Sequence, residues 1–224
     1  MTVEDQEQQD GFSLCQDTAV VYSLVDQVAE GVVKLVNASN DHQIACHRGC
    51  NTCCTVFVMA TYAEAAEIAK WLLSPSQTET LNRFRKQMEL WHTIMGPKVE
   101  LLGVLSTKHN GRPTVEPDAQ LYGEALKAYH QRLFMCPFNA GDGSCGIYPI
   151  RPVVCRTFYV ADSCEYCTFN GNGEITIVRH ATLTEVALLA RHVLRELSAA
   201  AGNDSLSALP SAVAQALAIM QGDC

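Results

Sequence analysis

The chain has 224 residues, of which 48% are apolar, and its formal net charge at neutral pH is −8. This length fits one domain or two small ones, and the apolar share is that of an ordinary globular protein. The acidic balance disfavours binding to nucleic acids or anionic membranes, because both need a basic stripe.

The first residues are acidic and polar, and we expect residues 1–14 to be disordered. They have neither the basic start nor the apolar centre of a signal peptide. No run in the chain reaches the roughly 18 to 20 apolar residues that a membrane-spanning helix needs. We therefore expect a cytoplasmic protein whose thiols stay reduced.

Residues 17–38 predict the first helix. Its apolar residues recur every three or four positions, as on one face of an amphipathic helix, at Val21, Val25, Val28, Val32 and Leu35. A short apolar run at 55–60 follows. It predicts either a strand or an extended segment that leads into the next helix.

Three capping boxes mark helix starts, because a hydroxyl and a carboxylate three residues apart can bond the free amides there. They are Thr61-Tyr-Ala-Glu64, Ser76-Gln-Thr-Glu79 and Thr182-Leu-Thr-Glu185. The helices that begin at the Thr61 and Ser76 boxes are expected to end at Ser74-Pro75 and Gly96-Pro97, since proline disrupts a helix. Residues 103–118 contain two glycines and two prolines and predict a loop.

The remaining chain predicts three helices and one strand. Residues 122–133 predict a helix, and the alternation at 174–179 predicts a strand that pairs with residues 157–161 in a short hairpin. A last helix has Pro210 in its first turn. The clearest helical face of the chain lies in 182–200 and consists of Leu183, Val186, Ala187, Ala190, Leu194 and Leu197.

Together these elements predict a mainly α fold. We expect a single helical domain over residues 15–224. The region at about 44–167 is expected to hold a small, irregular and cysteine-rich part, because its cysteine stretches are rich in glycine and proline.

Nine of the eleven cysteines cluster in three stretches, at 46–54, 136–155 and 164–167. Core packing does not explain this, because a buried free cysteine comes singly. In a reduced compartment such spacings favour metal ligation over disulfides. The candidate ligands are Cys46, Cys50, Cys53, Cys54, Cys136, Cys145, Cys155, Cys164 and Cys167. We expect the first two stretches to converge on one region, and we do not expect Cys15 or Cys224 to be ligands.

The sequence leaves two alternatives for the identity of the metal centre, zinc and an iron–sulfur cluster. Each takes four ligands, so the seven thiols of the first two stretches suit one site with spare thiols or two centres. Because histidine is scarce here, we favour an iron–sulfur cluster of the 4Fe–4S type over zinc. His47 and His180 are the nearest histidines, and we expect them at the surface or around the ligands.

One cysteine spacing also occurs in another class of iron–sulfur proteins. Cys46-x3-Cys50-x2-Cys53 is the spacing of the radical-SAM cluster loop. That chemistry sits on repeated βα units, whereas this chain shows one convincing strand. The spacing is therefore a minor alternative.

The combined pattern extends beyond the thiols. Its first half is the Cys46–Cys54 stretch followed by a helix at 63–72, and its second half is Cys136-Pro-Phe, Cys145-Gly-Ile-Tyr148, Arg151-Pro152 and Cys155-Arg156. This pattern resembles the YkgJ-type cysteine-cluster proteins, which are described as zinc- or iron-chelating domains. The resemblance covers about residues 44–167 and implies a metal site. Three residues separate Cys46 from Cys50, where the family's CxxCxxCC pattern has two. Flagellin lysine methylases carry a similar cysteine pattern, so an enzymatic function stays an alternative.

Other residues of the motif have expected roles. Phe138 and Tyr148 should pack against the metal centre and exclude water. Arg151 or Arg156 should either donate hydrogen bonds to the thiolates or form surface salt bridges.

Three functions follow from this reading. The first is a metal-binding protein whose centre serves storage, delivery or structure. The second is an iron–sulfur enzyme or electron carrier that acts in protein modification, and the third is an interaction module held together by zinc. The sequence shows no Ser–His–Asp set, phosphate loop or dinucleotide fingerprint. The expected partner is a metal ion or cluster, with no nucleic acid and no membrane.

Overall fold

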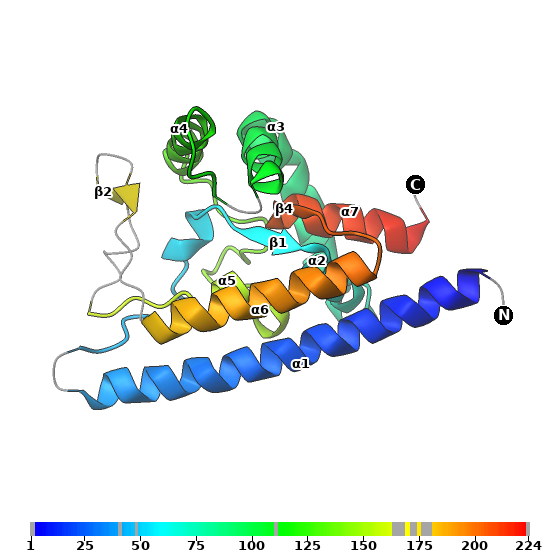
Figure 1. Ribbon diagram of the computed structural model, residues 1–224, viewed down its shortest axis with the longest axis horizontal. Coiled ribbons are helices and arrows are strands. Elements are labelled where there is room, and N and C mark those ends of the chain that lie inside the picture. The colour runs from blue at the N-terminus through cyan, green and yellow to red at the C-terminus, as the bar shows by residue number, and fades with distance from the viewer. Residues whose placement is uncertain are drawn as a thin grey trace.

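The computed structural model describes residues 3–39, 42–47, 49–109, 112–162, 169–170, 174–175 and 181–222. Its helices are α1 (Val3–Ala38), α2 (Tyr62–Leu72), α3 (Thr78–Lys108), α4 (Asp118–His130), α5 (Val153–Arg156), α6 (Ala181–Ala200) and α7 (Leu209–Gln221). Its strands are β1 (Met59–Thr61), β2 (Phe169–Asn170), β3 (Glu174–Ile175) and β4 (Leu206–Ala208). Short 3-10 helices cover Thr52–Thr55, Pro75–Gln77 and Tyr148–Ile150. The prediction of a mainly α fold is confirmed (Figure 1).

The first helix begins earlier than expected. Residues 1–14 are expected to be disordered, whereas α1 begins at Val3. Glutamate and glutamine are good helix formers, and acidic residues favour a helix start through the helix dipole. These polar residues therefore extend the amphipathic helix that follows them.

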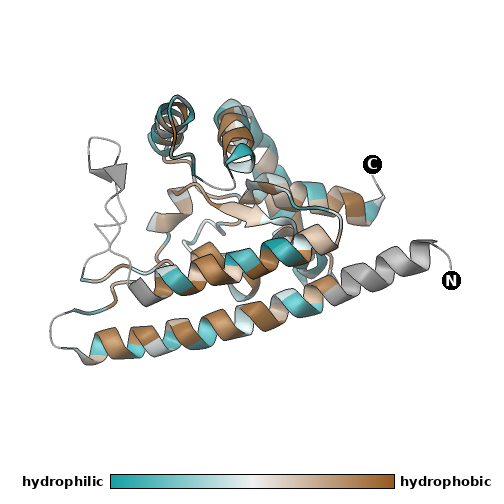
Figure 2. Cartoon of the chain, viewed as in Figure 1, coloured by the Kyte–Doolittle hydropathy of each residue, from teal (hydrophilic) through white to brown (hydrophobic). Residues whose placement is uncertain are grey.

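The buried face of α1 is only partly the predicted one. Val28 and Leu35 are exposed, while Val25 and Val32 are buried. From residue 14 on, where its side chains are described, α1 buries Leu14, Cys15, Thr18, Tyr22, Val25, Ala29 and Val32. This face packs against α6, which lies alongside α1 (Figure 1). The predicted face of α6 is confirmed, because Leu183, Ala187, Ala190 and Leu194 are buried there. Hydrophilic and hydrophobic residues alternate along both helices (Figure 2).

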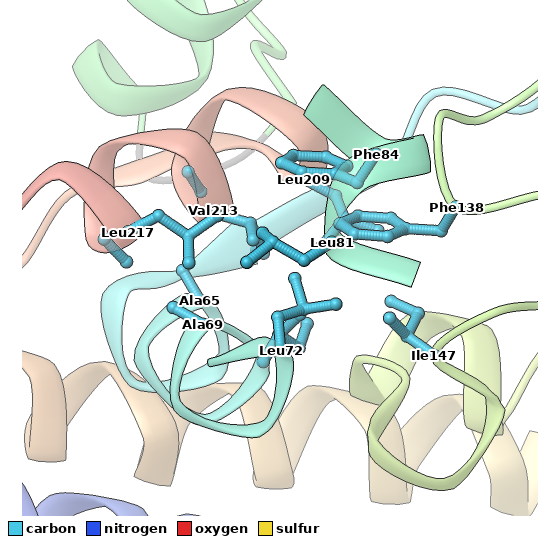
Figure 3. Close-up of a cluster of buried hydrophobic side chains, with 14 residues drawn as sticks. Ala65, Ala69, Leu72, Leu81, Phe84, Phe138, Ile147, Leu209, Val213 and Leu217 are labelled. Atoms are coloured by element: carbon cyan, nitrogen blue, oxygen red, sulfur yellow. The ribbon is translucent and has the colours of Figure 1, made fainter. Parts of the chain in front are cut away.

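Helix α2 begins with the predicted capping box. The Thr61 hydroxyl accepts a hydrogen bond from the amide of Glu64, and the Glu64 carboxylate accepts one from the amide of Thr61, 2.9 Å away. The helix ends at Leu72, shortly before Pro75. It packs closely against α7, and Figure 3 shows Ala69 and Leu72 of α2 in one cluster with Leu217 of α7.

The same core reaches the second cysteine stretch. The ring of Phe138 stacks on that of Phe84 from α3, with centroids 4.5 Å apart and planes 3° apart (Figure 3). Ile147 is 1% exposed and belongs to this cluster. Cys136 and Cys145 are partly buried and pack against it. The core therefore anchors the irregular cysteine-bearing segment at two points.

Helix α3 corrects three predictions. It runs through Gly96-Pro97, where it is expected to end, and continues to Lys108 into the predicted loop. Its buried residues Trp91, Met95 and Val99 keep one continuous face on the core across the proline. Packing therefore outweighs the cost of proline in a helix. The N-cap residue is Gln77, so the predicted box at Ser76 does not cap this helix.

Two small sheets are present in the described residues. Strands β1 and β4 pair antiparallel, with Thr61 opposite Leu206, and β4 is not predicted by the sequence. Strand β3 starts at the predicted residue Glu174, but it pairs with β2 and not with residues 157–161. Ala161 instead pairs with Ile44. The hairpin is thus more local than expected, and residues 176–179 of the predicted strand lie outside the described residues.

The last two helices largely match their predictions. Helix α6 begins at Ala181, one residue before the threonine of the third capping box. Helix α7 has Pro210 in its first turn, as predicted. Among the described helices, none is both long and apolar enough to cross a membrane.

Candidate functional site

Seven of the nine predicted cysteine ligands line one cavity of about 610 Å³. They are Cys46, Cys50, Cys53, Cys54, Cys136, Cys145 and Cys155. The predicted convergence of the first two stretches is therefore confirmed. Cys164, Cys167, His180 and Cys224 lie outside the described residues. Cys15 is buried between α1 and α2 and does not line the cavity.

The first stretch forms a compact turn. The amide of Cys50 donates to the carbonyl of His47, and the amide of Cys54 donates to the carbonyl of Asn51. Cys53 and Cys54 lie in the 3-10 helix Thr52–Thr55. His47 also lines the cavity, and its Nδ1 atom lies 3.1 Å from the carbonyl of Ala45.

The second stretch meets the first through the backbone. The amide of Cys136 donates to the carbonyl of Cys54 at 2.8 Å. At a second point, a Cβ atom on Gly143 would lie 2.8 Å from the carbonyl oxygen of Gly49. Gly143 also has a φ of 88°, which favours glycine. The two stretches are therefore in direct contact at two places.

The loop that carries Cys145 is closed by its own hydrogen bonds. Asn139 and Cys145 form a β-bridge, and the amide of Gly146 donates to the carbonyl of Phe138 at 2.8 Å. With Phe138 and Ile147 in the core, this thiol is presented from a short and well-anchored loop.

Cys155 lies in the short helix α5, which Glu64 holds in place. The carboxylate of Glu64 accepts a hydrogen bond from the amide of Val153 at 2.9 Å. Burial raises the pKa of Glu64, while the hydrogen bonds from Thr61 and Val153 oppose that shift by favouring the carboxylate. The sequence shows the capping role of Glu64 at α2 but gives no sign of this second contact.

The two arginines of the motif have different roles. Arg156 is 3% exposed, forms an ion pair with Asp26 of α1, and donates to the carbonyls of Pro149 and Arg151 at 2.6 Å each. Its guanidinium also lies 4.0 Å from the Tyr22 ring. Arg156 therefore fixes the backbone around Cys155, and its ion pair joins a buried guanidinium to a carboxylate that is 43% exposed, so neither a hydrogen bond to a thiolate nor a fully exposed salt bridge is found for it.

Arg151 lies at the cavity itself. Its guanidinium carbon lies 4.0 Å from the centroid of the Tyr148 ring. It lowers the pKa of Cys46, Cys145 and Cys155 against the larger effect of burial, which raises all three. Arg151 therefore acts on the thiols through its charge, and the predicted hydrogen bonds from an arginine to the thiolates stay a prediction.

The aromatic residues of the motif both line the cavity, as do Tyr159 and Phe158. Phe138 is 3% exposed and also belongs to the hydrophobic core. Tyr148 is 55% exposed and contacts Arg151, so it lies at the rim. Tyr159 is a site residue that the sequence motif does not indicate.

Four of the thiols form a tetrad in which, within every pair, a negative charge on one thiol raises the pKa of the other. The tetrad consists of Cys53, Cys136, Cys145 and Cys155. Burial is the main cause that raises the pKa of Cys136 and Cys155, and a thiol–thiol contact with Cys54 is the main cause for Cys53. The tetrad therefore holds neutral thiols, whose protons a metal centre would have to displace.

The remaining thiols of the first stretch lie near Cys53 of this tetrad. Cys46 interacts with Cys50 and Cys53, and Cys54 contacts Cys53. The thiol of Cys46 also accepts a hydrogen bond from the amide of Val160 at 3.3 Å. Cys53 is thus the thiol that links the two sets.

Within the described residues, no three or more His, Cys, Asp and Glu side chains form a group that could hold a metal ion. Ligation of any metal centre would therefore require these thiols to rearrange.

No protein-family model, curated protein or solved structure matches the chain. The resemblance to YkgJ-type proteins stays a prediction that rests on the cysteine pattern.

Proposed function

We propose that the protein binds an iron–sulfur cluster in the cysteine-lined cavity. The observation that supports this most is the tetrad of Cys53, Cys136, Cys145 and Cys155, in which all six pairs of thiols interact. Four cysteines are the ligand set that a 4Fe–4S cluster takes. The cluster would supply a centre that can change its charge by one electron.

The donor atoms favour a cluster over harder metals. Seven thiols line the cavity, and its described lining includes no Asp or Glu. Thiolates select zinc, Cu(I) and iron–sulfur centres. This donor set is consistent with the YkgJ-type resemblance and with iron ahead of calcium or magnesium.

The near absence of histidine among the donors favours a cluster over zinc. Of the described residues that line the cavity, seven are cysteines and one, His47, is a histidine. Cys46, Cys50 and Cys54 would then be spare thiols near the cluster. The proposal also requires reduced thiols, which the expected cytoplasmic location would supply.

The test is metal analysis of protein purified and reconstituted without oxygen. We expect a brown protein with iron and sulfide near four per chain and a broad absorption band above the protein peak. Colourless protein with stoichiometric zinc would replace the cluster by a zinc centre. Protein that binds neither would overturn the proposal.

Single substitutions test the ligand set. Cys53→Ser, Cys145→Ser and Cys155→Ser should each lower the iron content strongly. Cys15→Ala is the matched control, because Cys15 is also a buried thiol but does not line the cavity. Equal iron loss in the control would show that the effect is on folding and not on ligation.

A further inference from the structure

The two arginines of the cysteine-rich segment differ in what neutralises them. Arg156 is paired with Asp26 and with two backbone carbonyls. Arg151 lines the cavity, and the described part of the chain provides no carboxylate within ion-pair distance of it. Arg156 therefore stabilises the fold, whereas Arg151 supplies a positive charge to the cavity.

The guanidinium of Arg151 is held against one wall. The Tyr148 ring lies beneath it at 4.0 Å, and the Tyr159 hydroxyl interacts with it. Its Nε atom is shielded from solvent and has no hydrogen-bond partner among the described residues. A shielded donor without a partner costs free energy and calls for an explanation. An anionic group inside the cavity would provide one.

The cluster itself would be that anionic group. Arg151 interacts electrostatically with Cys46 from the first stretch and with Cys145 and Cys155 from the tetrad. Four thiolates around a 4Fe–4S core give a net negative charge, and reduction adds one more. Among the described residues that line the cavity, Arg151 is the one fixed cation and no carboxylate opposes it. A nearby cation stabilises the more negative of two states.

We propose that Arg151 stabilises the reduced state of the bound cluster, so that the centre accepts electrons and is not only structural. This inference rests on the proposed function. In the step, one electron passes from a low-potential one-electron donor to the cluster, and one iron changes from ferric to ferrous. No covalent bond forms or breaks. Arg151 acts in this step only through its positive charge, which its position holds near the cluster.

The test is the reduction potential of the reconstituted full chain, measured by dithionite titration with visible absorption. Arg151→Gln removes the charge and keeps a polar side chain. At a fixed applied potential it should lower the ratio of reduced to oxidised cluster at least threefold, which is about 28 mV for one electron. Arg151→Lys keeps the charge and should shift the ratio less. An unchanged potential in Arg151→Gln overturns the inference.

Two further variants separate a local effect from a general one. Arg132→Gln makes the same change of net charge at an exposed arginine that does not line the cavity. It should leave the potential unchanged, and an equal shift would overturn the inference. Tyr148→Leu keeps the arginine but removes the ring that orients it, and we expect a smaller shift in the same direction.

The Tyr148→Leu variant also decides the case in which Arg151→Gln loses its cluster. A shift toward more negative potential then supports the inference, and no shift overturns it. The proposed function fails separately from this inference. Wild-type protein that takes up no cluster overturns the function, whereas a cluster whose potential is independent of Arg151 overturns the inference alone.

Discussion

The carboxylate of Glu64 lies 2.9 Å from the backbone amide of Val153, which donates a hydrogen bond to it. The same carboxylate caps α2 through Thr61. One buried side chain thus closes the N-termini of α2 and α5, which are far apart in the sequence. Because α5 carries Cys155, the position of this thiol depends on a residue of α2.

Replacing Glu64 by glutamine should destabilise the protein. Thr61 and Val153 donate to different oxygens of Glu64, and glutamine has an NH2 group, which only donates, in place of one of them. We expect the free energy of unfolding to fall by about 1–3 kcal/mol, measured by urea unfolding of the metal-free protein. Glu79→Gln is the control, because its side chain is 93% exposed. A similar loss in the control would contradict the double capping role.

A matched pair of glycines tests the contact between the two cysteine stretches. Gly141 and Gly143 have φ angles of 80° and 88°, so alanine is strained at either position. Only at Gly143 would the new Cβ atom meet the Gly49 carbonyl, whereas at Gly141 nothing lies within 4 Å of it. Gly143→Ala should therefore lower iron uptake and stability, by about 1–3 kcal/mol from strain and contact together. Gly141→Ala should show the strain part alone. Equal effects would show that the contact contributes nothing.

His130 should make the protein less stable in mild acid. Burial lowers the pKa of His130 from its ordinary 6.5 to about 4, and its Nε2 atom accepts a hydrogen bond from the amide of Phe57. As the pH falls from 6.5, the unfolded chain takes up a proton that the folded protein refuses until about pH 4. Stability should thus fall across this range, by on the order of 3 kcal/mol in total.

The measurement for His130 is the free energy of unfolding against pH. His130→Gln should flatten the part of the curve between pH 6.5 and 4. His192→Gln, at a histidine whose side chain is 70% exposed, should keep the wild-type slope. A His130→Gln curve as steep as that of the wild type would assign the acid sensitivity to other groups.

Metal removal should loosen the cysteine-rich part before the helices. Residues 136–156 have little regular structure, and ordering them costs about 1–2 kcal/mol of backbone entropy per residue. A bound metal centre can offset this cost, while α1 and α6 have long buried faces of their own. Hydrogen exchange of cluster-loaded and metal-free protein should show lost protection in 136–156 and retained protection in α6. Equal protection of 136–156 in both forms would mean that the centre does not stabilise the fold.

The sequence predicts best where the partners are close in the chain. The Thr61–Glu64 box and the buried face of α6 depend on spacings of three and four residues, and both are confirmed. Predictions fail where contacts between residues far apart in the sequence determine the local structure. Proline at position 97 is tolerated because Trp91, Met95 and Val99 hold α3 on the core. Strand β4 has three residues and exists through its pairing with β1.

The site shows the same division. The cysteine spacings identify seven thiols that meet at one cavity, but they do not show that Cys53 joins Cys136, Cys145 and Cys155. Nor do they separate the two arginines of the motif. The structure separates them, because Arg156 pairs with Asp26 of α1 whereas Arg151 lines the cavity.

Trp91 gives the molecule an internal optical reporter. It is fully buried in the cluster of α3 and α4 that contains Tyr129, and Tyr129 lines the cysteine cavity. An iron–sulfur chromophore accepts excitation energy from a nearby indole, so cluster uptake would quench the emission of Trp91. The chain has two tryptophans, and the other, Trp71, packs against a different core cluster. With Trp71 replaced by phenylalanine, filling of the centre could be followed in real time by fluorescence, without an attached dye.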